Sequence, residues 1–320
     1  MTSARFARES VTSESEIIQM GQPFSVFGFL EERFPNFHRP LHRIFSQARH
    51  HRAESIILER IEQSEDIRQE NEDLEIRCSL PEGFESDLWR VSFFDESVTN
   101  QKSLEGVSEE SFLGYAIIKR DAISRHDRPR VYESVFRKSN HLNNYVRGEK
   151  QWNCRVNGRD FPVVGYLYAQ QNNLTNVCAH VAVRTVATRF HRDGDMTYRE
   201  MNQVLGIDHR GEHLLGEERG LFTNEIIQLI DQAGASYSHL NYPREGDDIG
   251  GTTSEESWNE RAPYQNLIYP SIESGFPALL AFNTSDPSMG HVVPVLGHTF
   301  NEDAWIPQAD FGYFKVGSEI

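Results

Sequence analysis

The hydrophobic positions in the middle of the chain follow the pattern of β-strands. Three short segments are rich in β-branched and aromatic residues and are bounded by turn-forming residues: residues 88–94, 112–119 and 130–137. Residues 151–168 hold Asn157-Gly158 between two alternating apolar runs, a sequence typical of a β-hairpin turn. We therefore expect a β-rich region, in which Cys154 packs inside the first strand of the hairpin as a small buried side chain.

The pattern before these strands is polar at first and then helical. Roughly the first forty residues are polar, and we expect them to be weakly ordered. Residues 41–67 then carry an imperfect helical stripe of apolar positions, namely Leu41, Ile44, Ile56, Ile57 and Ile61. This spacing predicts a helix over residues 41–67. Residues 1–150 are thus interpreted as a helical N-terminal segment and a smaller β-rich module of unknown role.

From about residue 175 the apolar positions follow a helical period. They recur at i, i+3, i+4 and i+7 in Ala179, Ala182, Val183, Val186 and Phe190. Thr175 or Asn176 can cap this helix, which places Cys178 in its first turn.

Two shorter helices are expected further along the chain. Thr197 caps residues 198–205 and Thr223 caps residues 224–233, with a glycine directly after each helix. An acidic, Gly-rich loop follows at residues 243–257.

The end of the sequence predicts a return to strands. Gly275 can end a helical turn, and residues 277–283 and 291–300 are both apolar and strand-like. The whole pattern indicates an α+β fold, with residues 151–320 as a second domain that holds a helix-borne cysteine and an antiparallel sheet.

The composition narrows the classes of function. The chain has 48 acidic and 32 basic residues, a net charge of −16, which argues against nucleic acid or an anionic membrane as the main partner. No apolar run approaches the ~18 residues of a membrane-spanning helix, and the N-terminal residues lack a signal-peptide pattern. These features predict a cytoplasmic protein whose three cysteines are free thiols.

Cys178 is the candidate nucleophile. Unpaired N–H groups and the helix dipole at a helix start favour the thiolate, which is the reactive form of cysteine. The N–H of Cys178 can also donate to a developing oxyanion. Gln171 is the expected second donor, with Gln170 and Asn172 as neighbours that could substitute for it.

His291 is the candidate base, because it follows a flexible turn and opens an apolar strand. His180 is closer in sequence, but two residues along a helix correspond to a rotation of ~200°, so it faces away from Cys178. We expect His180 to serve in packing or hydrogen bonding. His209 and His213 have an HxxxH spacing in a glycine-flanked loop, which does not favour a metal site, and we expect neither a metal nor a cofactor.

The order of Gln171, Cys178, a long helical stretch and His291 on the second of two strands resembles papain-like cysteine peptidases. Within this class, the chain is most similar to the bacterial group that processes double-glycine leaders. The similar segments are "MTYREMNQVLGI", "GLFTNEIIQLIDQAGA", "IESGFPALLAFN" and "GHVVPVLGHT". The resemblance covers about residues 165–300. It implies a papain-like catalytic domain and a peptide or protein substrate.

Two positions depart from the family pattern. The family places its glutamine six residues before the cysteine, where this chain has Asn172. The family's third residue, which orients the histidine, follows the histidine strand; Asp303 and Asp310 are the candidates here, and the orienting strand can equally be missing from this chain.

These residues are compatible with three functions. The first is hydrolysis of a peptide or isopeptide bond, in which Cys178 attacks, His291 transfers the proton and Gln171 binds the oxyanion. The second is acyl transfer or transglutamination with the same residues, where an amine resolves the thioester. The third is a non-catalytic binding module. In each case the N-terminal module can position a substrate, inhibit the enzyme or bind a protein partner.

Overall fold

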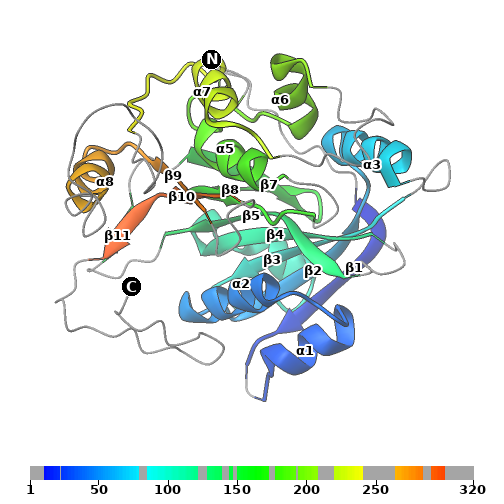
Figure 1. Cartoon of the computed structure of the whole chain (residues 1–320). Helices are drawn as coiled ribbons and strands as arrows, with labels where there is room; N and C mark the ends of the chain where they lie inside the picture. Colours follow the sequence, from blue (N-terminus) through cyan, green and yellow to red (C-terminus); the bar gives the residue numbers. More distant parts are fainter. Residues whose placement is uncertain are drawn as a thin grey trace, which may run out of the picture.

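The computed structural model describes residues 11–21, 23–78, 85–121, 128–138, 144–146, 150–172, 177–191, 194–207, 220–240, 264–283 and 290–299. Its largest element is a curled antiparallel sheet of seven strands in the order β1-β2-β3-β4-β5-β8-β7 (Figure 1). The strands are β1 (Val11–Gln19), β2 (Ser55–Ile61), β3 (Asp87–Phe94), β4 (Phe112–Arg120), β5 (Pro129–Arg137), β7 (Lys150–Val156) and β8 (Arg159–Tyr168). The three strands and the hairpin predicted between residues 88 and 168 are confirmed.

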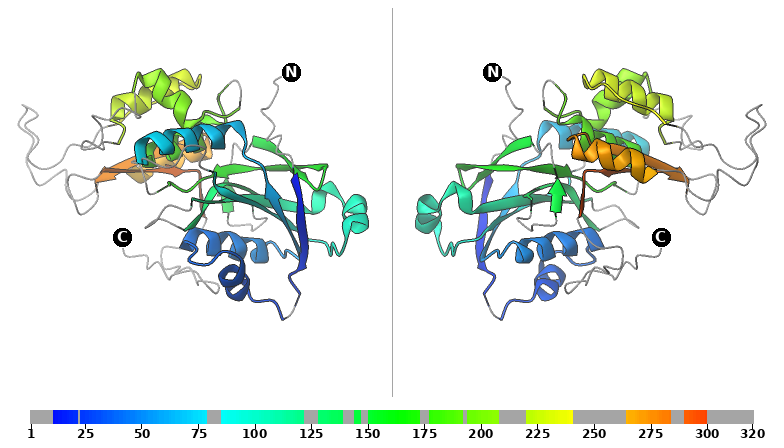
Figure 2. Two further views of the ribbon diagram at one scale, coloured as in Figure 1. Left: turned by 90° about the vertical axis from the view of Figure 1, so that its right-hand side faces the viewer. Right: turned by 90° about the vertical axis from the view of Figure 1, so that its left-hand side faces the viewer.

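Helices form a layer on each side of this sheet (Figure 2). On one side lie α1 (Val26–Arg33) and α2 (Arg39–His50). On the other lie α3 (Glu65–Cys78), α5 (Cys178–Ala187), α6 (Tyr198–Leu205), α7 (Thr223–Gln232) and α8 (Tyr264–Glu273). The short α4 (Gln101–Gly106) and a 3₁₀ turn (Glu109–Ser111) lie between β3 and β4. The fold is therefore α+β, as predicted.

The prediction of one helix over residues 41–67 was wrong. Helix α2 ends at His50, and the isoleucines that follow belong to strand β2. Ile56 packs with α1 and α2, whereas Ile57 and Ile61 pack in the core on the opposite face of the sheet. A strand buried on both faces has a continuous apolar run, which a helical stripe can imitate over a short window.

The expectation of a weakly ordered N-terminus was also wrong for the described residues. Strand β1 pairs antiparallel with β2, and α1 buries Val26, Phe29 and Leu30. Polar residues dominate β1 because it is an edge strand of the sheet.

The sheet continues across residue 150, where the boundary between two domains was expected. Strand β8 pairs with β5, and β7 pairs with β8 around the turn at Asn157-Gly158. Both turn residues have positive φ, 43° and 84°, which the Asn-Gly pair supplies at little cost. Cys154 is buried in the core of the sheet, as expected.

The C-terminal part of the chain forms a third core around α5, α6 and α7. Strands β9 (Ala278–Asn283) and β10 (Gly290–Val295) form a two-stranded hairpin in contact with α5. Strand β11 (Gly297–Thr299) pairs with β6 (Asn144–Val146), so the last described residues return to the segment between β5 and β7.

Candidate functional site

Cys178 is the first residue of α5 and is half-buried. The N-cap is Val177, whose side chain makes no capping hydrogen bond; the caps expected at Thr175 and Asn176 lie outside the described residues. Val177 cannot cap through its side chain, so it leaves the N–H groups of the first turn available to another acceptor. The predicted position of the thiol at a helix start is confirmed.

Two buried ion pairs fix the direction of α5. Arg184, in the last turn of the helix, binds Asp195 at 2.7 Å and Glu133 of β5 at 3.0 Å. Burial tends to raise the pKa of the Asp195 carboxyl, but Arg184 outweighs it and holds that pKa below its usual range. Because Glu133 belongs to the sheet, the helix that carries Cys178 is attached to the scaffold at its other end.

His291 is the second residue of β10 and is half-buried. The hairpin register places it opposite Phe282, and the two rings lie 5.7 Å apart, so both side chains leave the same face. Leu279 and Leu296 pack against the α5–α6–α7 core, and by strand alternation Leu279 lies on the other face. The hairpin thus contacts the helices mainly through the face that does not carry His291.

The structure brings α5 and β10 into contact but does not close a Cys–His pair. Between these two described residues there is no hydrogen bond from the His291 ring to the Cys178 sulfur. Catalytic hydrogen bonds in substrate-free enzymes are often open and form only when the substrate binds.

The three neighbouring amides before α5 have different partners. The side-chain oxygen of Gln170 accepts a hydrogen bond from the N–H of Val131 at 3.2 Å. Asn172 is buried and donates to Glu70 at 3.4 Å. Gln171 is half-buried, and its side chain makes no hydrogen bond to another described residue. Of the three, only Gln171 has a side chain without a partner among the described residues, so its amide is available as a donor.

His180 has the structural role expected for it. Its ring is buried, its Nε2 lies 2.9 Å from Oδ1 of Asn202, and it packs edge-on against Tyr198 of α6. This residue therefore joins α5 to α6.

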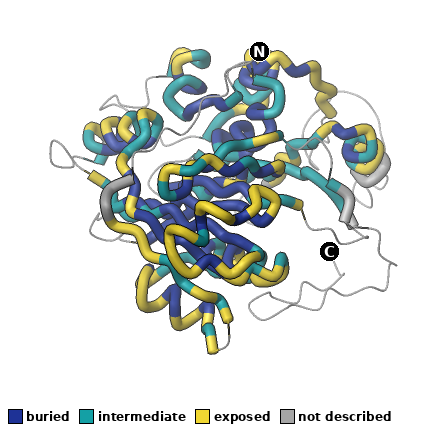
Figure 3. Tube along the Cα trace, turned by 180° about the vertical axis from the view of Figure 1, so that it is seen from behind, coloured by how far each residue is buried: buried dark blue, intermediate teal, exposed yellow. Residues whose placement is uncertain are grey.

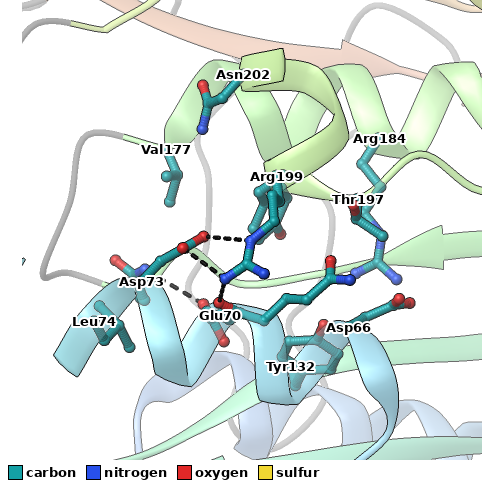
Figure 4. A pocket seen from close by; sticks show the side chains of 13 residues that line it. Asp66, Glu70, Asp73, Leu74, Tyr132, Val177, Arg184, Thr197, Arg199 and Asn202 are labelled. Carbon is teal, nitrogen blue, oxygen red and sulfur yellow. Dashed lines mark hydrogen bonds and ion pairs between the residues drawn. The ribbon is translucent and has the colours of Figure 1, made fainter. Parts of the chain in front are cut away.

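A small pocket lies beside the start of α5, between α3 and α6 (Figure 4). It encloses about 50 Å³, which is room for a few water molecules. Val177, Asn172 and Asn202 line it on the side of α5 and α6, and Glu70 and Asp73 line it on the side of α3. Arg184 and Arg199 also line it, so the wall next to the helix start holds both carboxylates and guanidinium groups.

Paired charges hold α3 in this position. Glu70 binds Arg130 at 2.7 Å and Lys119 at 2.9 Å, and Arg199 of α6 binds Asp73 at 2.7 Å and Glu72 at 3.0 Å. Burial by itself raises the pKa of the Glu70 carboxyl, but the two cations outweigh it and lower that pKa to about 2.

Sequence analysis did not predict α3 as a separate helix near the site. Its acidic first turn, with Glu65 and Asp66, is the signal that could have shown a helix start after residue 64.

The remaining predicted positions have no described geometry. His209, His213, Asp303 and Asp310 lie outside the described residues. Within the described part of the chain, no group of three or more His, Cys, Asp or Glu residues could hold a metal ion. None of the described helices combines the length and the apolar character needed to cross a membrane.

Comparisons with known proteins give no relative. No protein family, no curated protein and no solved structure matches this chain.

Proposed function

We propose that this chain is a cysteine-dependent hydrolase of the papain-like class that cleaves a peptide or isopeptide bond. The observation that carries the proposal is the position of Cys178 as the first residue of α5, a helix whose N-cap side chain makes no hydrogen bond and which contacts β10, the strand that carries His291 as its second residue. The resemblance to the bacterial peptidases that process double-glycine leaders supports it.

Each residue has one task in the proposed reaction. The thiolate of Cys178 attacks the carbonyl carbon, and the N–H of Cys178 and the amide of Gln171 donate to the oxyanion. His291 takes the proton from the thiol and returns it to the leaving amine. Water then resolves the thioester; in the acyl-transfer alternative an amine does so. Since the His291 ring lies against Phe282, on the hairpin face that packs less on the helices, the proposal requires the start of β10 to move together with the ring towards Cys178 when a substrate binds.

A non-catalytic binding module is the second candidate function. The open Cys–His geometry and the contact of His291 with Phe282 favour it, because a ring held by packing needs no role in proton transfer.

The reactivity of the thiols separates the two candidates. Cys78 is a matched control, because it is also half-buried but ends α3, where the helix dipole disfavours a thiolate. With iodoacetamide at neutral pH, followed by mass spectrometry, we expect Cys178 to react at least about tenfold faster than Cys78. Equal rates for the two cysteines would support the binding module.

A second measurement identifies the base and the substrate. His291→Ala should reduce the alkylation rate of Cys178 and change its dependence on pH, whereas His180→Ala should leave both unchanged. Incubating a peptide library with the protein and with Cys178→Ala shows which peptides are cleaved. Repeating this with an added amine distinguishes hydrolysis from acyl transfer.

A further inference from the structure

The solvent side of α2 is basic, in a chain whose net charge is −16. The helix buries four apolar side chains against the sheet, at the i, i+3, i+4, i+7 spacing of an amphipathic helix: Leu41, Ile44, Phe45 and Ala48. In Figure 3 the sheet is mostly buried, whereas α1 and α2 beneath it alternate between buried and exposed residues. The positions of α2 on its other side are Arg39, His42, Arg43, Ser46, Gln47, Arg49 and His50.

The basic character extends beyond the helix. Residues 33–52 contain five arginines and four histidines, with no lysine and no acidic residue to offset them. Burial lowers the pKa of His38, and the nearby charge of Arg128 lowers it further, so this guanidinium lies close to the start of α2. We use the term basic face for five exposed residues: Arg39, Arg43, Arg49, Arg52 and Arg128.

The fold itself makes little use of this charge. The last four of these arginines make no ion pair with another described residue, although the chain has 48 acidic and 32 basic residues. Arg49 suits the negative end of α2, but Arg39 lies in the first turn, where the helix dipole disfavours a cation. Helix stability therefore does not explain the basic face, and its charge remains available to an anionic partner.

We propose that the basic face binds an extended acidic segment of a partner protein. The guanidinium fork of arginine binds a carboxylate through two parallel hydrogen bonds, which lysine cannot do, and the cations of this face are all arginines. Arg39 and Arg43 lie ~6 Å apart along the helix axis, and side chains on one side of an extended peptide are ~6.6 Å apart. A segment with Asp or Glu at every second position therefore matches this spacing.

The size of the basic face favours a peptide over a nucleic acid or a membrane. Helix α2 is ~18 Å long, which an extended peptide covers with about six residues. Three exposed carboxylates border the face: Glu31 and Glu32 of α1, which contacts α2, and Glu54, two residues after Arg52. A duplex or a lipid surface is broader than one helix and would meet these carboxylates, whereas a narrow peptide can avoid them.

The basic face and the candidate catalytic residues lie on opposite sides of the sheet (Figure 2). A segment bound to α2 therefore leaves Cys178 accessible. Because the apolar side of α2 is already packed on the sheet, the face exists before the partner binds, and the protein needs no ordering to form it.

Fluorescence anisotropy with two labelled peptides of twelve residues tests the proposal. One peptide alternates Glu and Ser, and the other alternates Gln and Ser, so that they differ only in charge. The full-length protein is titrated into each at ~0.1 M salt, where the Debye length is ~10 Å. We expect the Glu peptide to bind at least about tenfold more tightly than the Gln peptide, through several charge-assisted contacts.

Two double variants locate the binding site. Arg43→Gln/Arg49→Gln removes two charges of the basic face, whereas Lys102→Gln/Arg155→Gln removes two exposed charges from α4 and β7. An exposed ion pair changes affinity by up to about fivefold, so we expect the first variant to bind the Glu peptide about tenfold more weakly. The second should stay within about twofold of the unmodified protein. All four side chains are exposed, so both variants should fold.

Four outcomes would overturn the proposal. Equal affinity for the two peptides, or equal losses in the two double variants, would show that the basic face does not select the acidic segment. Tighter binding of a single-stranded DNA 12-mer or of phosphatidylserine vesicles, weakened by Arg43→Gln/Arg49→Gln, would assign the face to a nucleic acid or a membrane. A dimer that is seen by sedimentation and is lost in this variant would assign it to a second copy. None of these measurements depends on the proposed catalytic function, so the two proposals can fail separately.

Discussion

The seven-stranded sheet and the region from α5 to β11 are packed in different ways. The sheet has a core on each face, and side chains such as Phe93, Phe94 and Ile57 are fully buried. The C-terminal region has one smaller core around three helices, and its hairpin keeps exposed apolar residues. The candidate residues Cys178 and His291 both lie in this second region, whose packing is less complete.

Several ion pairs join the two regions. Arg184 joins α5 to β5, Arg199 joins α6 to α3, and Glu70 joins α3 to Arg130 and Lys119 of the sheet. The well-packed sheet thus holds the less completely packed region in a defined place, an arrangement typical of proteins whose functional residues lie on loops and element ends. From this difference we predict that substitutions in the sheet mainly change stability, whereas substitutions at the start of α5 mainly change activity.

The largest expected effect separates Cys178 from Cys154. We predict that Cys178→Ala abolishes any thiol-dependent activity without changing the melting temperature, because alanine suits a helix start and the site is half-buried. Cys154→Ala should keep the activity and lose about 1 kcal/mol of stability, since it removes an atom from the core of the sheet. Activity assays and thermal unfolding of both variants measure this. If Cys154→Ala were inactive and Cys178→Ala active, the nucleophile would be Cys154 in the sheet, and our assignment would be wrong.

Two phenylalanines test the difference in packing. Phe93→Ala should lower the free energy of unfolding by about 3–5 kcal/mol, because it leaves a cavity in a core with no exposed side. Phe222→Ala, in the C-terminal region, should change it by less than about 0.5 kcal/mol, since the ring is 59% exposed. Denaturant unfolding of the two variants gives both values. Similar losses would mean that the two regions do not differ in packing.

The packing of each element also explains how well its secondary structure could be predicted from the sequence. The strands at residues 88–94, 112–119 and 130–137 were predicted well because period and β-branched composition agree there. The helix at Cys178 was found because its apolar stripe and its start coincide. Strand β2 was mistaken for helix because burial on both faces removes the alternation that identifies a strand.

The candidate site was less predictable than the fold. The pocket depends on α3, which is far from Cys178 in sequence. Arg199 joins α3 to α6, and Asn172 joins it to the segment before α5. A sequence contains no local signal for such long-range ion pairs. The face on which His291 lies depends on the register of β9 and β10, and a shift of one residue would reverse it.

A further prediction concerns the oxyanion donor, which lies in the segment that connects the sheet to α5. We predict that Gln171→Ala lowers turnover by ~10²–10³ with little change in substrate binding, because this contact forms mainly in the transition state. Asn172→Ala should affect turnover less, since Asn172 is engaged with Glu70 of α3. Steady-state kinetics of both variants provide the test. If Asn172→Ala caused the larger loss in turnover, the donor would lie at the offset used by the resembling family.

Acid should weaken the contact between the regions before it affects the sheet. The pKa of Glu70 is lowered to about 2, below its usual value near 4.5, so its stabilising contribution is present above pH 4.5 and is lost as the pH falls towards 2. We predict that hydrogen exchange of α3 and α6 increases between pH 4.5 and 3, after correction for the intrinsic exchange rate. Glu70→Gln should show the faster exchange already at pH 7 and little further change with acid. An unchanged acid response in Glu70→Gln would show that another group is responsible.

The smallest expected effect concerns Arg199, which joins α6 to α3 at a partly exposed position. Its guanidinium binds Asp73 and Glu72 and also donates to the backbone oxygen of Gln69 at 2.8 Å. Exposed ion pairs contribute 0–1 kcal/mol, and the additional hydrogen bonds place this group near the upper end of that range. We predict that Arg199→Met lowers the free energy of unfolding by about 1 kcal/mol and increases hydrogen exchange in α6. Arg68→Met is the matched control, because the Arg68 side chain pairs with Glu65 of the same helix and, among the described residues, with no residue of α6. If both variants increased hydrogen exchange in α6 equally, the cause would be the loss of a positive charge and not the loss of the contact between α3 and α6.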